Sequence, residues 1–178
     1  MSYHLLHPEF YLSLINRSCG LICVVDEKGF FKYANDALFE ITEYYTEDLQ
    51  GKLVIEYLHN NDLQAVKNIF LQLVAYKASE NLVFRIKTRS GNWKWMDAVV
   101  TNSLNDEHIS GYIIEARDIS IKVGLQEDLE RSQVFFNSFF QNHHSAVFTL
   151  STDGILEQVN DNLQRILSYS RKEMVGEH

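Results

Sequence analysis

The sequence is poor in proline and lacks any long hydrophobic run, and each shortage removes a class of protein. One Pro and eight Gly among 178 residues argue against long disordered linkers. The longest uninterrupted apolar run is Leu21–Val25, whereas a membrane-spanning helix needs about 20 apolar residues. The first ten residues contain no basic segment followed by an apolar block, so we expect no signal peptide. We therefore expect a protein with no membrane segment in this stretch.

Cysteine is also scarce, which excludes a disulfide framework. Cys19 and Cys23 stand four residues apart in a predicted strand, so we expect both side chains on one face. They are expected to act as small apolar side chains rather than as a redox pair. His143 and His144 are adjacent and fall on different faces of any helix or strand, which makes them a poor metal pair. We expect no metal site and a reduced, cytoplasmic protein.

Basic residues and catalytic signatures are missing as well. Lys and Arg number 16 against 24 Asp and Glu, a formal net charge of −8, which disfavours a nucleic-acid partner. The sequence holds no glycine-rich phosphate loop, metalloprotease motif, histidine phosphoacceptor motif or cyclase signature. We therefore expect no catalytic residues and no enzyme activity in this segment, although its parent protein could be a histidine kinase.

The sequence does contain an internal repeat at an offset of 125 residues. Residues 26–51 match residues 151–176 without a gap, and the apolar runs before them, 21–25 and 146–150, match too. The identical pairs are Gly29/Gly154, Asn35/Asn160, Asp36/Asp161, Leu38/Leu163, Ile41/Ile166, Tyr44/Tyr169 and Gly51/Gly176. The second copy stops before the rest of the unit, so the chain is interpreted as one complete unit, a connector and the beginning of a second. We expect residues after about 145 to be disordered or folded against a partner, without a complete core.

Turn residues and periodicity predict the elements of one unit. Pro8 suits the first turn of a helix over 8–17, and Asn35 or Asp36 is expected to cap a short helix after a hairpin. The predicted ranges are strands at 20–26 and 30–34, short helices around 37–50, a long helix at 61–77, and strands at 81–88, 93–104 and 107–118. This order is typical of an α+β fold, with a five-stranded antiparallel sheet and helices on one face.

The same residues carry a family resemblance. They are Asp26-Glu27-Lys28-Gly29, Ala34-Asn35-Asp36-Ala37, Tyr44, Leu49-Gln50-Gly51, Leu58-His59-Asn60-Asn61-Asp62, Phe84-Arg85, Trp93-Lys94-Trp95-Met96-Asp97 and Arg117-Asp118-Ile119-Ser120. In this order and spacing they resemble a PAS domain with a C-terminal PAC segment, the sensory box of bacterial signalling proteins. Asn60 in place of the family's usual proline and Ser120 in place of threonine are mild departures.

The resemblance implies an internal pocket, and the sequence limits what that pocket holds. The stretch after Gly51 has no reactive cysteine and residues 61–77 have no histidine, so covalent flavin and haem are disfavoured and the cofactor stays unknown. His59, just before that helix, is interpreted as a hydrogen-bonding or capping residue. The candidate pocket lining, for a possible small-molecule ligand, is Cys23, Val25, Phe39, Leu58, Phe70, Leu73, Phe84 and Ile113.

The tryptophans lie in one predicted strand, where Trp93, Trp95 and Asp97 share a face and Lys94, Met96 and Ala98 share the other. Packing in the core or at an interface is the favoured interpretation of this aromatic pattern. A stacking wall for a planar ligand is the alternative.

The connector is predicted to be a helix with a coiled-coil seam. Leu125, Leu129, Phe136 and Phe139 recur at heptad positions, with Ser132 between them, and no Pro or Gly interrupts residues 125–144. We expect a parallel homodimer through this seam, while packing of the helix on its own sheet stays open. By resemblance, such helices carry strain from the sheet, here through Asp118 as signal relay, to a downstream output domain in the same chain.

The sequence thus predicts four segments: an N-terminal helical extension at 1–17, a PAS/PAC domain at 18–120, a linker helix at 121–143 and an incomplete second PAS domain at 144–178. The predicted function is a sensory and dimerisation module of a two-component sensor, most often a histidine kinase in this family. The alternatives are a ligand-free interaction scaffold, or the sensor of a diguanylate cyclase or transcription regulator.

Overall fold

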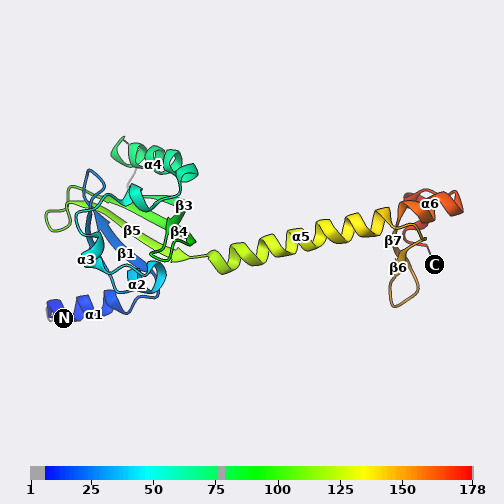
Figure 1. The fold of residues 1–178 in the computed structure, drawn as a ribbon, viewed down its shortest axis with the longest axis horizontal. Helices are drawn as coiled ribbons and strands as arrows, with labels where there is room; N and C mark the ends of the chain where they lie inside the picture. The colour runs from blue at the N-terminus through cyan, green and yellow to red at the C-terminus, as the bar shows by residue number, and fades with distance from the viewer. Residues whose placement is uncertain (1–6, 76–78, 178) are drawn as a thin grey trace, which may run out of the picture. The chain divides into compact units, whose positions relative to one another are not determined.

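A computed structural model describes residues 7–75 and 79–177, which form two compact units that divide between Val123 and Gly124 (Figure 1). Each unit is described by itself. None of the helices among these residues is both long enough and apolar enough to cross a membrane.

The first unit holds a five-stranded antiparallel sheet in the order β2-β1-β5-β4-β3. Its strands are β1 (Leu21–Val25), β2 (Phe31–Ala34), β3 (Ser79–Lys87), β4 (Trp93–Ser103) and β5 (Gly111–Asp118). Its helices are α1 (Pro8–Asn16), α2 (Ala37–Thr42), α3 (Thr46–Leu49), the 3₁₀ turns η1 (Val54–Tyr57) and η2 (Asn60–Asp62), and α4 (Leu63–Ala75). The predicted fold class is confirmed.

The core of this unit lies between one face of the sheet and the helices α2, α3 and α4. Because strand side chains alternate, every second residue of each strand enters this core, as the buried Met96, Ala98 and Val100 of β4 show. Figure 1 shows α2 and α3 near one end of the sheet and α4 near β3. The helices supply Leu38, Leu49 and Leu73 to the same core.

Two sequence-based boundaries differ from the structure. The last strand begins at Gly111 rather than 107, because the Asp106 carboxylate accepts the backbone N–H groups of His108 and Ile109 and forms a turn there. The first strand begins at Leu21, so Cys19 precedes it and is exposed while Cys23 is buried. The two cysteines therefore do not share a strand face, contrary to the prediction.

Asn35 has a larger role than the predicted helix cap. Its side chain is almost fully buried, and its Oδ1 accepts the N–H of Ile22 at 2.9 Å. Its Nδ2 donates to the carbonyl oxygens of Ile15 at 3.1 Å and Gly20 at 3.0 Å. Asp36 occupies the N-cap position of α2 without a side-chain cap bond. Asn35 therefore ties the end of α1 and the start of β1 to the turn that enters α2.

The second unit contains most of α5 (Ser120–Asn142), followed by a hairpin and two short helices. These are β6 (Phe148–Leu150), β7 (Leu156–Val159), α6 (Asp161–Leu167) and α7 (Arg171–Met174). Asn160 repeats the contacts of Asn35: its Oδ1 accepts from Val147 N–H and its Nδ2 donates to the Ser145 carbonyl oxygen. The 125-residue repeat is therefore also a repeat of local structure.

The second unit has only a small core, built on Val159, Leu163 and Met174. Residues 146–177 are folded within this unit, so the alternative of disorder does not hold for them, whereas folding against a partner stays a prediction. Phe148 and Leu150 are exposed, although their counterparts in the first unit, Cys23 and Val25, are buried in the core beside β5. This core is therefore smaller than that of the first unit, as expected from the repeat.

Candidate functional site

The interior of the first unit encloses a small cavity with an entirely apolar lining. The lining residues are Val54, Leu58, Val66, Phe70, Leu82, Phe84, Val100 and Ile114. The volume of this cavity is about 20 Å³. A single water needs about 10–15 Å³, and small-molecule sites are typically about 300–1,000 Å³. The side chains in this structure therefore fill nearly all of the space between α4 and the sheet.

The predicted pocket residues divide into three groups. Leu58, Phe70 and Phe84 line the cavity. Cys23, Val25 and Leu73 are buried in the surrounding core. The other two residues of the predicted lining, Phe39 and Ile113, do not reach it.

Phe39 is 43% exposed and stacks on Tyr45 with 4.4 Å between ring centroids, because it lies on the outward side of α2. Ile113 lies on the outer face of the sheet, because β5 places Tyr112 and Ile114 inward and the intervening residue outward. An error of one residue in the predicted alternation of β5 moves every side chain to the opposite face of the sheet. Ile114 therefore points into the core, where Ile113 was predicted to point.

An ion pair holds one wall of the cavity. Asp62 accepts from Arg85 at three atoms: the backbone N at 2.8 Å, Nε at 3.0 Å and Nη2 at 2.7 Å. The backbone N–H of His59 donates to the Arg85 carbonyl oxygen, and the Nδ1 atom of the His59 ring accepts the backbone N–H of Asn61. The capping role predicted for His59 is therefore observed, and this segment is fixed to β3 beside Leu58.

We expect the Asp62–Arg85 pair to make the stability of the first unit depend on pH. The hydrogen bonds from Arg85 hold the pKa of the Asp62 carboxyl below its usual value, against the opposing effect of burial. A lowered folded-state pKa gives stability that is present above about pH 4, the unfolded value, and lost as pH falls through the folded-state pKa. The substitution Asp62→Asn should cost about 1.5–3 kcal/mol at pH 7 and much less at a pH below the folded-state pKa of Asp62.

The measurement is urea unfolding followed by tryptophan fluorescence, since both tryptophans of the chain lie in β4 of the first unit. Glu56→Gln, an exposed carboxyl removed from the same region, is the matched control and should change little at either pH. If Asp62→Asn lowered the free energy of unfolding equally at the two pH values, the ion pair would not contribute to the stability of the first unit.

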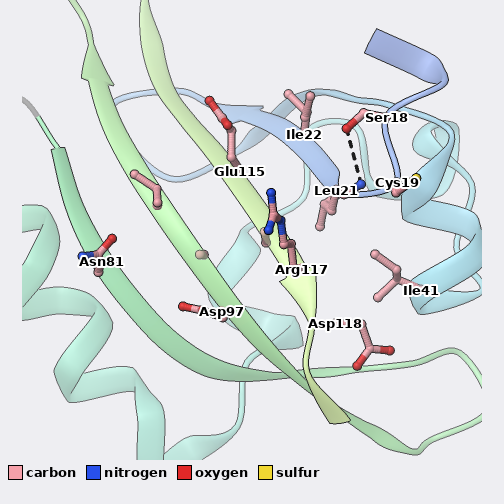
Figure 2. A pocket seen from close by; sticks show the side chains of 14 residues that line it. Ser18, Cys19, Leu21, Ile22, Ile41, Asn81, Asp97, Glu115, Arg117 and Asp118 are labelled. Atoms are coloured by element: carbon pink, nitrogen blue, oxygen red, sulfur yellow. Dashed lines mark hydrogen bonds between the residues drawn. The ribbon is translucent and has the colours of Figure 1, made fainter. Parts of the chain in front are cut away.

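A groove of about 810 Å³ crosses the outer face of the sheet and ends near the β5–α5 junction. Figure 2 shows its lining, with Asp97, Glu115, Arg117 and Asp118 among the labelled side chains. Asp97 lies opposite Arg117 in the β4–β5 register. With three carboxylates against one guanidinium in this set, the groove is acidic. That charge gives no support for a nucleic-acid partner.

Trp93 and Trp95 share one face of β4, as predicted, and this is the outer face of the sheet, where cationic side chains of β3 lie over them. The Arg85 guanidinium carbon is 4.7 Å from the Trp95 ring centroid, and Lys87 Nζ is 6.0 Å from that of Trp93. His59 meets the Trp93 ring edge at 4.8 Å between centroids. These contacts favour the packing interpretation over a ligand-stacking wall.

The junction between β5 and α5 is held by short hydrogen bonds. The backbone N–H of Ile119 donates to the Trp95 carbonyl oxygen at 2.8 Å, and the backbone N–H of Trp95 donates to Ser120 Oγ at 2.9 Å. Asp118 accepts the Ser120 N–H at 2.8 Å and pairs with Lys94 Nζ at 2.9 Å. Burial acts to raise the pKa of Asp118, but these hydrogen bonds outweigh it and hold the pKa below its usual value. The first turn of α5 is therefore fastened to the backbone of β4.

The predicted seam residues of α5 are all exposed. Leu125 is 66% and Leu129 is 56% exposed, and Phe136 and Phe139 are exposed as well. Apolar side chains along one stripe of a helix are typical of a surface that pairs with another helix.

Metal-ligating side chains and the buried cysteine were the remaining candidates for a reactive site in the described parts of the chain. Groups of three or more His, Cys, Asp or Glu residues able to hold a metal are absent from these residues. Burial raises the pKa of the Cys23 thiol to about 12, so this thiol behaves as an apolar group.

The fold and its junction define a small α+β domain of the sensor type, in which the last strand passes directly into a long helix. Comparison with protein families agrees: residues 31–114 match a family model described as PAS fold, and residues 144–178 match one described as PAS domain. These two ranges together cover more than half of the chain, which therefore belongs to the PAS-domain family.

Individual known proteins are similar to this chain in sequence or in fold. The chain is 24% identical over 162 residues to sporulation kinase E of Bacillus subtilis, a match that covers 90% of this chain but only 21% of the relative. The PAS domain of a protein from Colwellia psychrerythraea superposes with a TM-score of 0.57 at 17% identity, over 63% of this chain and 96% of that chain. A PAS domain from a two-component sensor histidine kinase gives 0.53 at 21% identity, over 62% and 94%.

Sequence reasoning missed two of the contacts that build these sites. The pairing of Asp62 with Arg85 joins residues 23 positions apart, and no local pattern indicates it. The bond between Ser120 and Trp95 could have been inferred only from the register of β4 and β5.

Proposed function

We propose that this chain is a sensory and dimerisation PAS module that passes signals from its first unit through α5 to a downstream output domain. The observation that carries the proposal is the junction at Asp118–Ser120, where three hydrogen bonds and one ion pair hold the end of β5 and the first residue of α5 against β4. A change in the position of β4 or β5 is therefore transmitted to the helix rather than absorbed by a loose linker.

The similarity to sporulation kinase E supports a histidine kinase as the parent protein. Because the chain spans about a fifth of that relative's length, the kinase output itself is part of the proposal. A cytoplasmic location, also proposed, is consistent with Cys19 as an exposed free thiol.

A second mode of action is favoured by the filled interior. The cavity of about 20 Å³ has an apolar lining and is far smaller than a typical small-molecule site, which supports an interaction domain that senses a protein contact. Native mass spectrometry of the purified chain separates the two modes. A stoichiometric small molecule supports ligand sensing, and the unliganded mass together with an unchanged melting temperature in cell extract supports contact sensing.

The relay itself is tested by weakening the junction. The substitution Asp118→Ala removes the acceptor of the Ser120 N–H and the partner of Lys94. Loss of a hydrogen bond to a charged group costs about 1.5–3 kcal/mol, so we expect at least roughly tenfold faster hydrogen exchange of the amides at 119–123. The exchange of the inner amides of β1 and β5 should stay unchanged.

Arg117→Ala is the matched control for this measurement, because it truncates the neighbouring exposed residue of β5 and leaves the junction bonds intact. If Asp118→Ala left exchange at 119–123 at the wild-type rate, the junction would not be the mechanical connection and the proposed relay would be wrong.

A further inference from the structure

Two exposed aromatic rings stack on each other where α2 leads into α3. The rings of Phe39 and Tyr45 lie 4.4 Å apart between centroids, at an interplanar angle of 16°. Phe39 is 43% exposed and Tyr45 is 54% exposed, so the pair presents apolar area to solvent. Neither ring lines the interior cavity, and neither belongs to the core of the first unit. The packing of the fold therefore does not explain the pair.

The second unit shows that the local fold does not need these rings. At the 125-residue offset, Gln164 stands in place of Phe39 and Ser170 in place of Tyr45. Both units nevertheless end the first helix in the left-handed conformation, with φ of 65° and 61° at the equivalent C-cap residues. In both units the next helix begins three residues after that C-cap. The aromatic pair is therefore a feature of the first unit alone.

Tyr45 also departs from the residue types that suit its position. It is the N-cap of α3 and forms no side-chain cap bond, whereas N-caps favour Ser, Thr, Asp and Asn. The equivalent N-cap of α7 is Ser170, whose Oγ donates to the Glu173 carboxylate at 2.7 Å. An exposed residue that departs from local preference, with no compensating contact in the core, is typical of a functional site.

The surface that carries the pair is strongly acidic. Residues 33–51 contain five carboxylates and no Lys or Arg, a net charge of −5. The equivalent residues 158–176 contain two carboxylates and three basic residues, a net charge of +1. The acidic charge therefore belongs to the first unit and not to the local fold. The five carboxylates are those of Asp36, Glu40, Glu43, Glu47 and Asp48.

Two of these carboxylates stand beside the rings in helical spacing. Asp36 precedes Phe39 by three residues and Asp48 follows Tyr45 by three residues, and positions three apart are neighbours on a helix face. Asp48 already binds a guanidinium, that of Arg89, at 3.0 Å. The carboxylates that form no ion pair and no hydrogen bond among the described residues are those of Asp36, Glu40 and Glu47.

We infer that the Phe39–Tyr45 pair and the carboxylates around it form a docking site for an arginine-bearing segment of a partner protein. A guanidinium is planar, so it can stack on an aromatic ring and form an ion pair with a neighbouring carboxylate at the same time. The outer face of the sheet shows this chemistry, because the Arg85 guanidinium lies 4.7 Å from the Trp95 ring centroid and pairs with Asp62. An uncharged segment leaves the carboxylates of the site unpaired and an acidic one is repelled, so the charge selects a cationic occupant.

Hydrogen bonds connect this surface to the strand that holds the α5 junction. The backbone N–H of Arg89 donates to the Thr42 carbonyl oxygen at 2.9 Å, and the backbone N–H of Ser90 donates to the Glu43 carboxylate at 2.8 Å. The end of α2 is thereby fixed to the turn between β3 and β4. The site supplies the external contact that the contact-sensing mode of the proposed function requires, and in this respect the inference rests on that mode.

The test is a binding titration of the full 178-residue chain with a fluorescein-labelled nonapeptide of arginine, followed by fluorescence anisotropy. Phe39→Gln and Tyr45→Ser, made together, introduce the residues that the second unit has at these positions, so the local fold should persist. We expect the dissociation constant of this double variant to be roughly tenfold higher than that of wild type, with an unchanged or higher urea midpoint. Tyr169→Ser is the matched control, because it removes a 59% exposed tyrosine from the equivalent loop of the second unit and should bind as wild type does.

Each outcome decides the inference. Equal affinity of wild type and the double variant overturns the docking site, because charge alone then accounts for binding. A lower urea midpoint of the double variant also overturns it, because the rings then serve the fold. A nonapeptide of lysine should bind wild type more weakly, since an ammonium does not stack as a guanidinium does, and equal affinity contradicts recognition of arginine.

Hydrogen exchange in the presence of the arginine peptide separates this inference from the proposed function. Slower exchange at 36–48 together with a changed rate at 119–123 supports both the docking site and the relay. Slower exchange at 36–48 with an unchanged rate at 119–123 keeps the docking site and contradicts its use as the input of the relay. Unchanged exchange at 36–48 overturns the docking site and leaves the relay to its own test.

Discussion

Replacing Leu125 and Leu129 together by aspartate should convert the chain from a dimer into a monomer in analytical ultracentrifugation. Both side chains lie on the exposed apolar stripe of α5, where they are 66% and 56% exposed in the single chain. In a paired seam they face the same residues of the partner, so the double substitution places four like charges in an apolar contact. The loss of burial alone costs about 1.5–3 kcal/mol for each leucine, and the charge repulsion adds to it.

Val134→Asp provides a matched control for this prediction. Val134 is an equally exposed apolar residue of α5, at 69%, but it lies on the side of the helix opposite the seam. It should leave the dimer intact. Equal sedimentation of wild type and the double variant, or dissociation by Val134→Asp as well, would show that α5 does not pair through the predicted seam.

The second large effect is expected from Asn35→Ala, which should destabilise the first unit by about 3–5 kcal/mol. Its side chain is almost fully buried and satisfies three backbone groups, those of Ile15, Gly20 and Ile22. Each buried group left without a partner costs about 1–3 kcal/mol. Urea unfolding followed by tryptophan fluorescence measures the loss, because the only tryptophans of the sequence are Trp93 and Trp95 in this unit.

Two control variants sharpen the measurement. Asp36→Ala changes the neighbouring exposed residue, which makes no side-chain cap bond, and should cost little. Asn160→Ala breaks the equivalent contacts of the second unit and should leave the tryptophan transition in place. If Asn35→Ala lowered the free energy of unfolding no more than Asp36→Ala does, the hydrogen bonds of the Asn35 side chain would not stabilise the first unit.

The fold was predictable because its signals are local or repeated. Glycine and asparagine turns separate the strands, alternating burial marks β4, and the 125-residue offset places the second unit. Each of these patterns lies within a few neighbouring residues or occurs twice in the sequence. It can therefore be recognised without knowing which strands pair.

The residues that line the interior were predictable only in part. Which strand residues point inward depends on the register between strands and on contacts between residues far apart in the sequence. Leu58, Phe70 and Phe84 line the interior cavity, and their role as a ligand site stays a prediction. Ile113 and Ile114 are both isoleucine, so hydrophobicity could not decide which one points inward. The register of β5 against β1 and β4 makes that choice.

The assignment of Asn35 as a helix cap illustrates a different limit. Its position before a short helix is what a cap requires, and its repeat partner Asn160 does cap α6 by accepting the Leu163 N–H. In the first unit the same side chain instead serves the end of α1 and the start of β1. Local sequence cannot show this role, because Ile15 and Asn35 are 20 residues apart.

We propose that two copies of this chain pair in parallel through α5, so that a movement at each Asp118 junction is passed to one helix of the pair. A single-cysteine scan of residues 124–139, in a Cys19→Ser background, tests this most directly by the rate of disulfide formation between identical positions. We expect maxima at residues 125, 129, 132, 136 and 139, which all lie along one side of the helix. Uniform rates, or cross-linking confined to one point as in an antiparallel pair, would contradict it.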